Sequence, residues 1–333
     1  MNKRIILIGV IVLCVLAVAA FVLTRGHQVA PGGLGVSPTL APPAPTGIFP
    51  QPPNVKFSFK IAPNIPTSLP IYTFQPASYA TIDQLAARAA TTLNLGATPS
   101  AITRGGSTTK TWSRPNEAEL SLSQTNGTIN LVYRQAKSSE SPGALSPDVA
   151  VQQFLLSVIP LTPNMSIRAS GTDNGPFDGL LIFDNPPPTS FTNCYYSYVL
   201  GTYPVISSDL SIAPISIIAD AGGIIRFANI TPPPTSIQMS GAAPLLTQEN
   251  ILSSLAAGRG VLLDTHSPQA PNQGAVPVFS SFQINDTKIV YAPQGNFLMP
   301  ALYITGNGTA LNGASQNATI FLWLSPAGNS AQP

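Results

Sequence analysis

The hydrophobic positions of this chain follow a helical period in three places. Apolar residues recur every three or four positions after Thr81, after Ser146-Pro147 and after Thr247, and hydroxyl residues and a first-turn proline are favoured at helix starts. The expected helix ends are Gly96, Pro160 and Gly258. The apolar faces are Ile82, Leu85, Ala86, Ala89 and Leu93 in the first helix, Val151, Phe154, Leu155 and Val158 in the second, and Ile251, Leu252 and Leu255 in the third.

After each helix, β-branched and aromatic residues alternate with polar ones, which is the period of strands. The Asn126-Gly127 pair predicts a type I′ hairpin turn, and Asp220–Gly223 predicts a second hairpin. The expected strands are 110–113, 118–124 and 128–134, then 194–200, 215–219 and 224–229, and finally 278–284, 288–291, 298–305 and 318–324.

A short helix followed by antiparallel strands is typical of an α+β fold, in which each helix packs on one face of a β-meander. We expect two or three such modules. The first occupies residues 72–145, the second and third occupy 146–325, and residues 326–333 form a disordered tail. The spacing differs between the units, so the pattern does not predict a solenoid.

The N-terminal segment predicts a membrane anchor. Residues 5–23 are nineteen uncharged positions, which at about 1.5 Å per residue match the hydrocarbon core of a bilayer. Lys3 and Arg4 precede them, so the positive-inside rule keeps residues 1–4 in the cytoplasm and places the C-terminal domain outside the cell. The expected partner of residues 5–23 is the lipid bilayer. The alternative is a signal peptide cleaved near Ala17-Val18-Ala19, which would make the protein secreted.

The following segment, 24–71, is rich in proline and glycine. Prolines such as Pro42, Pro43 and Pro45 remove amide donors and favour polyproline II, so we expect a linker rather than a helix or a central strand. A semi-rigid spacer that holds the domain away from a surface and an ordinary disordered linker both fit this composition.

Charge and cysteine content narrow the function. The chain has 15 basic and 13 acidic residues, and after residue 30 the balance is 12 to 13. Such a domain has no basic patch for a phosphate backbone, so nucleic acid is not an expected partner. Cys194 is the one cysteine beyond Cys14, which leaves no disulfide within the domain. Its apolar, tyrosine-rich strand predicts core packing.

The reactive side chains do not form a recognisable catalytic pattern. Histidine occurs only at His27 and His266, too few for a multi-histidine metal centre. The run Asp264-Thr265-His266 predicts an exposed loop, because neighbours two positions apart rarely orient as a catalytic pair. Glu117 and Glu119 would share one strand face, whereas glycoside hydrolysis needs carboxylates opposed across a cleft. We therefore expect no catalytic, cofactor-binding or metal-binding residues, no cofactor, and a protein that is not an enzyme.

Aromatic residues and sequons remain as possible surface features. Tyr195, Tyr196, Tyr198, Trp112 and Trp323 either pack in the core or form a stacking platform for a sugar or a peptide, and the sequence leaves both open. Six Asn-x-Ser/Thr sequons matter only where the host glycosylates. They begin at Asn126, Asn164, Asn229, Asn285, Asn307 and Asn317.

Several of these segments resemble a known family. The first helix, the strand Lys110-Thr111-Trp112-Ser113, a second strand, an Asn-Gly turn and a third strand are together similar to the PepSY-type module and to the ectodomains of YycH/YycI-type proteins. Tyr198–Val205 and Asp220–Ile225 are similar to the tyrosine strand, turn and acidic hairpin of that group. The third helix end at Leu255–Gly260, followed by Ile289–Tyr291 and Phe297–Tyr303, is similar to its closing part. The resemblance covers residues 72–325. It implies an exported domain that regulates or contacts an envelope component, such as a sensor histidine kinase or a peptidase.

Two functions from different classes follow. The first is a membrane-anchored, extracytoplasmic, non-enzymatic protein that binds or regulates an envelope partner such as a sensor kinase or a wall enzyme. The second is a cell-surface carbohydrate-binding protein or weak glycoside-directed hydrolase, suggested by the uncharged polar surface and the aromatic residues. A concave cleft that joins Glu117, Asp178 or Asp264 to a tryptophan would favour the second.

Overall fold

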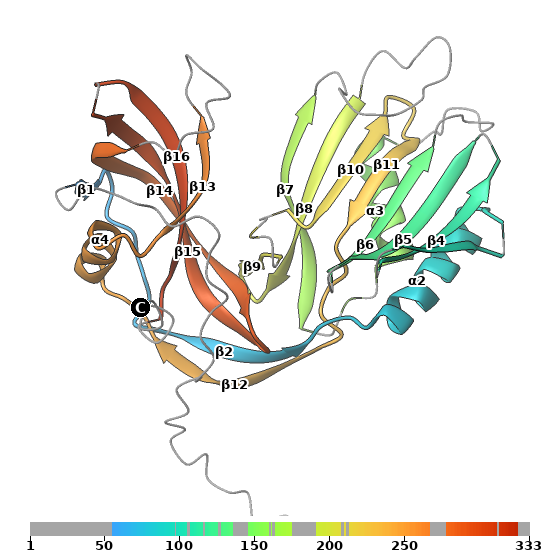
Figure 1. The fold of residues 1–333 in the computed structure, drawn as a ribbon, viewed down its shortest axis with the longest axis horizontal. Coiled ribbons are helices and arrows are strands. Elements are labelled where there is room, and N and C mark those ends of the chain that lie inside the picture. The colour runs from blue at the N-terminus through green and yellow to red at the C-terminus, as the bar shows by residue number, and fades with distance from the viewer. Residues whose placement is uncertain are drawn as a thin grey trace, which may run out of the picture. The chain divides into compact units, whose positions relative to one another are not determined.

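The computed structural model describes residues 55–325 except 97, 105–106, 116, 126–127, 136–145, 160, 162–163, 175–190, 208–209, 211–212, 267–277 and 312; of residues 104, 125, 128, 173–174 and 264–266 it describes the backbone alone. This part contains three helices and sixteen strands (Figure 1). The helices are α2 (Tyr79–Thr92), α3 (Pro147–Val158) and α4 (Gln248–Ala256). The strands are β1 (Lys56–Phe59), β2 (Ser68–Gln75), β3 (Ser100–Arg104), β4 (Ser107–Arg114), β5 (Ala118–Thr125), β6 (Thr128–Gln135), β7 (Met165–Asn174), β8 (Phe191–Leu200), β9 (Tyr203–Val205), β10 (Ile215–Asp220), β11 (Ile225–Ile230), β12 (Ser236–Pro244), β13 (Val261–His266), β14 (Phe279–Gln294), β15 (Phe297–Ala310) and β16 (Ser315–Trp323).

All of these strands belong to one hydrogen-bonded sheet. Its main order is β12-β2-β15-β14-β9-β8-β10-β11-β6-β5-β4-β3. Outside this path, β7 pairs with β8, β16 pairs with β15 and β13, and β1 pairs with β14. Most pairs are antiparallel, whereas β1 and β9 run parallel to β14. The sheet is therefore mixed, and it joins strands that are far apart in the sequence.

The three predicted helices are confirmed. α3 begins at Pro147, and α4 follows Thr247, whose hydroxyl accepts the Asn250 N–H. The residues predicted for the apolar faces are buried or partly buried in all three helices. The spacing of apolar side chains was sufficient to predict these helices, because each helix buries a single apolar stripe against the sheet.

The start of α2 differs from the prediction. The helix begins at Tyr79 because Ser78, and not Thr81, is the cap: the Ser78 hydroxyl accepts the Thr81 N–H at 3.2 Å. At the other end, the left-handed residue is Asn94, with a φ of 52°, where Gly96 was expected. Asparagine is the non-glycine residue that tolerates this conformation best.

Both predicted hairpins are confirmed. β5 and β6 pair antiparallel, with Thr125 opposite Thr128, whereas the expected turn residues Asn126 and Gly127 lie outside the described residues. In the second hairpin, the Asp220 carboxylate accepts the N–H groups of Gly222 and Ile224 at 2.9 and 3.0 Å. The Arg226 Nε donates to the same carboxylate at 2.8 Å. A buried ion pair therefore fixes the turn between β10 and β11.

The sequence did not predict β1, β2, β3, β7, β9, β12 or β13. Several of them show little alternation of hydrophobic and polar residues, as in β7 with its run of small and polar residues. These segments form strands because they pair with a neighbouring strand. β1 and the start of β2 lie within residues 24–71, the range expected to be a linker. Local composition predicted a spacer there, whereas β1 pairs with β14 and β2 with β12 and β15.

The prediction of two or three separate helix-on-meander modules is wrong. The structure is mostly β, and its strands form a single mixed sheet. β6 of the first expected module pairs with β11 of the second, with Leu131 opposite Ile230. α2 also packs against α3. Local periodicity sets which face of a strand is apolar, but it carries no information on which distant strand will be its neighbour.

Separate hydrophobic clusters pack against this sheet. α2 and α3 share one cluster with β4–β6, β8, β10 and β11, which includes Trp112 and Leu131. α4 covers a second cluster formed by β1, β14, β15 and β16, which includes Phe282 and Ile320. A smaller third cluster contains Val290 and Phe321. β14 and β15 thus pack side chains on both faces.

The description of the chain as a single-pass transmembrane protein is also corrected. A bilayer-spanning helix needs about 20 apolar residues. The longest helix in the described part of the chain is α2, with 14 residues, and none there is long and apolar enough to cross a membrane. The expected span at 5–23, the residues 1–4 before it and the tail at 326–333 lie outside the described residues.

Candidate functional site

Among the described side chains, the carboxylates and tryptophans considered for carbohydrate chemistry have other partners. Trp112 is buried in the cluster beneath α2. Glu117 forms an ion pair with Arg114 at 2.5 Å, and Glu119 pairs across β5 and β6 with Arg134 at 2.9 Å. Glu119 and Arg134 are half exposed, as expected for a solvated strand face. Asp178 lies outside the described residues.

The tyrosine-rich strand β8 mainly supplies core. Cys194 is a free thiol and buried, which confirms its predicted packing role. Tyr196 and Tyr198 are buried in the same cluster, and the Tyr198 hydroxyl donates to the Thr231 carbonyl at 2.8 Å. Burial raises the pKa of Tyr196 to about 12 and raises that of Tyr198 further. These two tyrosines are therefore not a stacking platform.

The Asp264-Thr265-His266 run is part of β13 and not of a loop, with Asp264 opposite Thr319 and His266 opposite Asn317. His27 lies outside the described residues. Among the side chains that the structure describes, no three of His, Cys, Asp or Glu lie together as a metal centre would require.

Three of the sequon asparagines come together on neighbouring strands. Asn285 on β14, Asn307 on β15 and Asn317 on β16 are exposed, and Asn307 lies opposite Asn317. They line a shallow pocket of about 280 Å³ together with Thr305 and Thr319. The amides and hydroxyls of this pocket carry no charge. The sequence showed each sequon but not their proximity, which depends on strand pairing.

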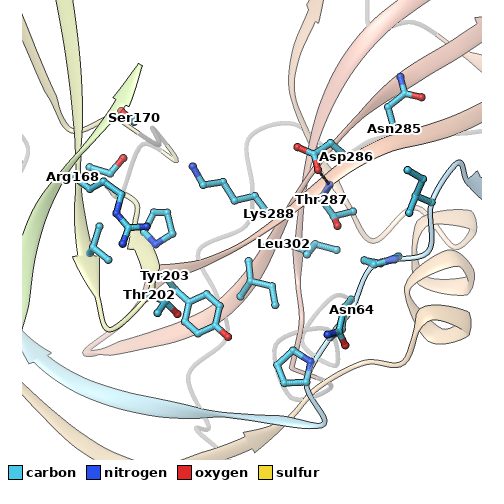
Figure 2. Close-up of a pocket in the computed structure, with 18 of the residues that line it drawn as sticks. Asn64, Arg168, Ser170, Thr202, Tyr203, Asn285, Asp286, Thr287, Lys288 and Leu302 are labelled. Atoms are coloured by element: carbon cyan, nitrogen blue, oxygen red, sulfur yellow. Dashed lines mark hydrogen bonds between the residues drawn. The ribbon is translucent and has the colours of Figure 1, made fainter. Parts of the chain in front are cut away.

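A larger pocket, of about 560 Å³, lies between β7 and β14 (Figure 2). We call it the β7–β14 pocket. Residues 61–66, which connect β1 to β2, form one wall, and residues 168–170 of β7 form another. Residues 202–204, at the turn from β8 into β9, and residues 285–289 of β14 form the remaining walls, together with Ser197, Val199 and Leu302. Segments from four distant parts of the sequence therefore build this pocket.

Tyr203 provides an aromatic wall of the pocket. Gly201, at a φ of 65°, turns the chain from β8 into β9 and so places Tyr203 there. The Tyr203 ring packs edge-on against Tyr291 with a centroid distance of 6.1 Å, and the Tyr291 hydroxyl donates to the Pro70 carbonyl at 2.9 Å. This wall is thus held by contacts to β14 and β2. It belongs to the Gly201–Val205 segment that the sequence singled out only as a turn.

Two cationic side chains extend into the pocket from facing strands. Figure 2 shows Arg168 reaching in from β7 and Lys288 reaching toward it from β14. Within the described part of the chain, neither forms an ion pair, whereas Lys110, Arg114, Arg134 and Arg226 all do.

Asp286 is the carboxylate of the pocket lining, and its Oδ1 accepts the Thr287 N–H at 2.8 Å. Lys60, at the end of β1, immediately precedes the wall formed by residues 61–66. In a chain in which 8% of residues are charged, this concentration of unpaired cations marks the pocket as a site for an anionic group. Sequence reasoning missed Arg168 and Lys288 because neither is part of a local motif.

A second pocket, of about 380 Å³, is mostly apolar. Five prolines contribute to its lining, with Phe74, Tyr198 and Leu298. It contains no charged side chain, so it offers less basis for selecting a ligand than the β7–β14 pocket does.

No protein-family model matches the chain, and no curated protein matches it. The resemblance to PepSY-type and YycH/YycI-type domains therefore stays a prediction. The case for a function rests on the pockets themselves.

Proposed function

We propose that this chain is a non-enzymatic, extracytoplasmic protein that binds an envelope partner through the β7–β14 pocket. The observation that carries the proposal is the pair of unpaired cations, Arg168 and Lys288, which extend into one pocket from facing strands. An arginine and a lysine so placed select a carboxylate or another anionic group. The partner is thus expected to present such a group on its surface.

The surroundings of the two cations support binding. Asp286 neutralises only part of their charge, and its carboxylate already accepts a backbone N–H. Tyr203, which is partly exposed, provides apolar contact area within the pocket. A few charged groups placed in a partly apolar cavity are typical of a specific binding site.

The proposal is tested by photo-crosslinking of the full-length protein to an envelope fraction. A photoreactive residue replaces Thr202, which lines the pocket and is exposed. We expect one reproducible crosslinked protein, and we expect the crosslink to weaken when salt is raised, because exposed charges are screened. The Arg168→Gln/Lys288→Gln variant should lose most of the crosslink.

The matched control is Arg88→Gln/Arg259→Gln, which removes the same charge from exposed positions outside the pocket. It should crosslink as well as the native sequence does. Equal crosslinking by both double variants would contradict the proposal, as would repeated recovery of the protein with no partner.

The second candidate, carbohydrate binding, is favoured by the pocket at Asn285, Asn307 and Asn317. Its uncharged amides and hydroxyls match the hydroxyl groups of a neutral glycan. On a neutral-glycan array, binding that is lost in Asn307→Ala and retained in Arg168→Gln/Lys288→Gln would support this function. Binding that persists in Asn307→Ala and Asn317→Ala would contradict it.

A further inference from the structure

Within the β7–β14 pocket, part of one edge of β14, its outer edge, has no partner strand among the described residues; we call this part the gap. One edge of β14 pairs with β15 along its whole length, from Phe279 to Gln294. The other edge pairs with β1 over Ser281–Ile284 and with β9 at Tyr291. Between these two partners, no strand of the described chain pairs with residues 285–290. At about 3.3 Å per residue, the interval from Ile284 to Tyr291 is about 20 Å long.

The orientation of the backbone groups in this gap follows from Pro300. Tyr291 lies opposite Pro300 of β15, and proline has no N–H to donate. The Tyr291 carbonyl points to the other edge, where it accepts the Ile206 N–H at 2.9 Å. Because backbone groups alternate between the two edges of an antiparallel strand, Ile289 and Thr287 point to the same outer edge as Tyr291.

Three backbone groups are consequently left on the outer edge. The Thr287 N–H donates to the Asp286 carboxylate. The Thr287 carbonyl, the Ile289 N–H and the Ile289 carbonyl have no backbone partner among the described residues. They lie in the lining of the pocket that also contains Arg168 and Lys288.

We propose that the β7–β14 pocket binds an extended, acidic peptide segment of its partner as an additional strand on β14. This inference rests on the function proposed above and specifies its ligand. A peptide residue beside Thr287 and Ile289 can donate to the Thr287 carbonyl and accept the Ile289 N–H, which is the pattern of a parallel pair. β1 and β9, the two neighbours of the gap, already run parallel to β14.

The cations set the side-chain preference of this peptide. Side chains of paired strands lie side by side on the same face, so the peptide residue beside Lys288 lies on the face from which Lys288 extends into the pocket. A carboxylate there faces Lys288, and Arg168 extends into the same pocket from β7 (Figure 2). Since strand side chains alternate between faces, the peptide residues two positions before and after this one lie beside Asp286 and Val290. A single acidic residue, beside Lys288, is therefore expected.

The inference is tested with an array of acetylated, amidated pentapeptides that carry aspartate or glutamate at the central position and varied uncharged residues elsewhere. The best binder is then compared with its counterparts in which single backbone amides are N-methylated, which keeps the charge and removes one donor. We expect at least one N-methylated form to bind about tenfold more weakly. We also expect the peptide to slow hydrogen exchange of the Ile289 amide in the full-length protein, while the Thr309 amide is unaffected.

The outcomes distinguish the inference from the proposed function. Equal binding of every N-methylated peptide, or unchanged exchange at Ile289, would overturn strand addition but leave anion recognition by Arg168 and Lys288 standing. An array without a binder would also overturn strand addition, and the crosslinking experiment would still decide the proposed function. If Arg168→Gln/Lys288→Gln changes neither peptide binding nor crosslinking, both fail.

Discussion

At the scale of single residues, burial decides what the polar side chains of this protein do. Cys194, Tyr196 and Tyr198 have the composition of a reactive or sugar-binding strand, yet all three are buried. Arg168 and Lys288 stand in strands without a motif, and both are exposed. The core role of Cys194 was predictable because its neighbours in sequence are apolar or aromatic. The role of the two cations was not, because their proximity arises from the pairing of distant strands.

The buried thiol of Cys194 is expected to make the protein less stable at alkaline pH. Burial raises the pKa of Cys194, and the Asp148 carboxylate raises it further. Tyr196 shifts in the same direction, to a pKa of about 12. A folded pKa above the unfolded one stabilises the fold below the unfolded pKa, and this stabilisation is lost as pH rises through the folded pKa. We therefore expect the free energy of unfolding to fall above about pH 9, as measured by chemical denaturation across this range.

Alkylation provides the complementary measurement at the same residue. In the native protein at about pH 9, iodoacetamide should modify Cys194 much more slowly than in denaturant, as followed on the Cys194 peptide by mass spectrometry. Equal rates in the two states would show that the thiol is accessible and would contradict the assigned packing.

At the scale of elements, close packing explains two glycines in the part of β15 beyond the expected strand 298–305. A Cβ on Gly306 would lie 2.3 Å from the Gln283 carbonyl oxygen and 2.6 Å from the Phe282 ring. A Cβ on Gly308 would lie 2.1 Å from the Phe279 ring. The sheet therefore needs glycine here so that two phenylalanines of β14 can cover the neighbouring strand.

The prediction at this scale compares two glycine-to-alanine changes. Gly306→Ala should lower the free energy of unfolding by about 2 kcal/mol or more, because the added methyl group meets backbone that cannot move aside. Gly241→Ala in β12 is the control, since nothing lies within 4 Å of the added Cβ. It should leave stability unchanged or raise it by up to about 1 kcal/mol. Equal losses in the two variants, measured by urea denaturation, would contradict the packing argument.

At the scale of the whole molecule, one sheet contains strands that the hydrophobic pattern of the sequence assigned to separate modules. Leu131 of β6 and Ile230 of β11 lie opposite each other and are both buried, although they belong to different modules in the sequence-based interpretation. Their cluster also contains Trp112 and residues of both α2 and α3. We therefore expect this part of the protein to unfold as one cooperative unit.

Fluorescence of Trp112 tests this cooperativity. In a Trp323→Phe background, Ile230→Ala should shift the denaturation midpoint reported by Trp112 by an amount that corresponds to about 2–5 kcal/mol. Leu311→Ala, which shortens an exposed side chain, should leave the midpoint in place. If Ile230→Ala leaves the denaturation midpoint reported by Trp112 unchanged, the modules unfold independently and the shared core is contradicted.

The sequence by itself determined the helices, their buried faces, the two hairpins and the packing of Cys194, because each depends on interactions between residues that are close along the chain. It also supplied the predictions for residues 1–54, which lie outside the described residues. The tertiary structure alone decided the single mixed sheet, the additional strands, the pocket with Arg168 and Lys288, and the gap on β14. Each of these features requires strands that are far apart in the sequence to become neighbours, as β1 and β14 do across more than two hundred residues. Local hydrophobic patterns do not specify which distant strand becomes the partner.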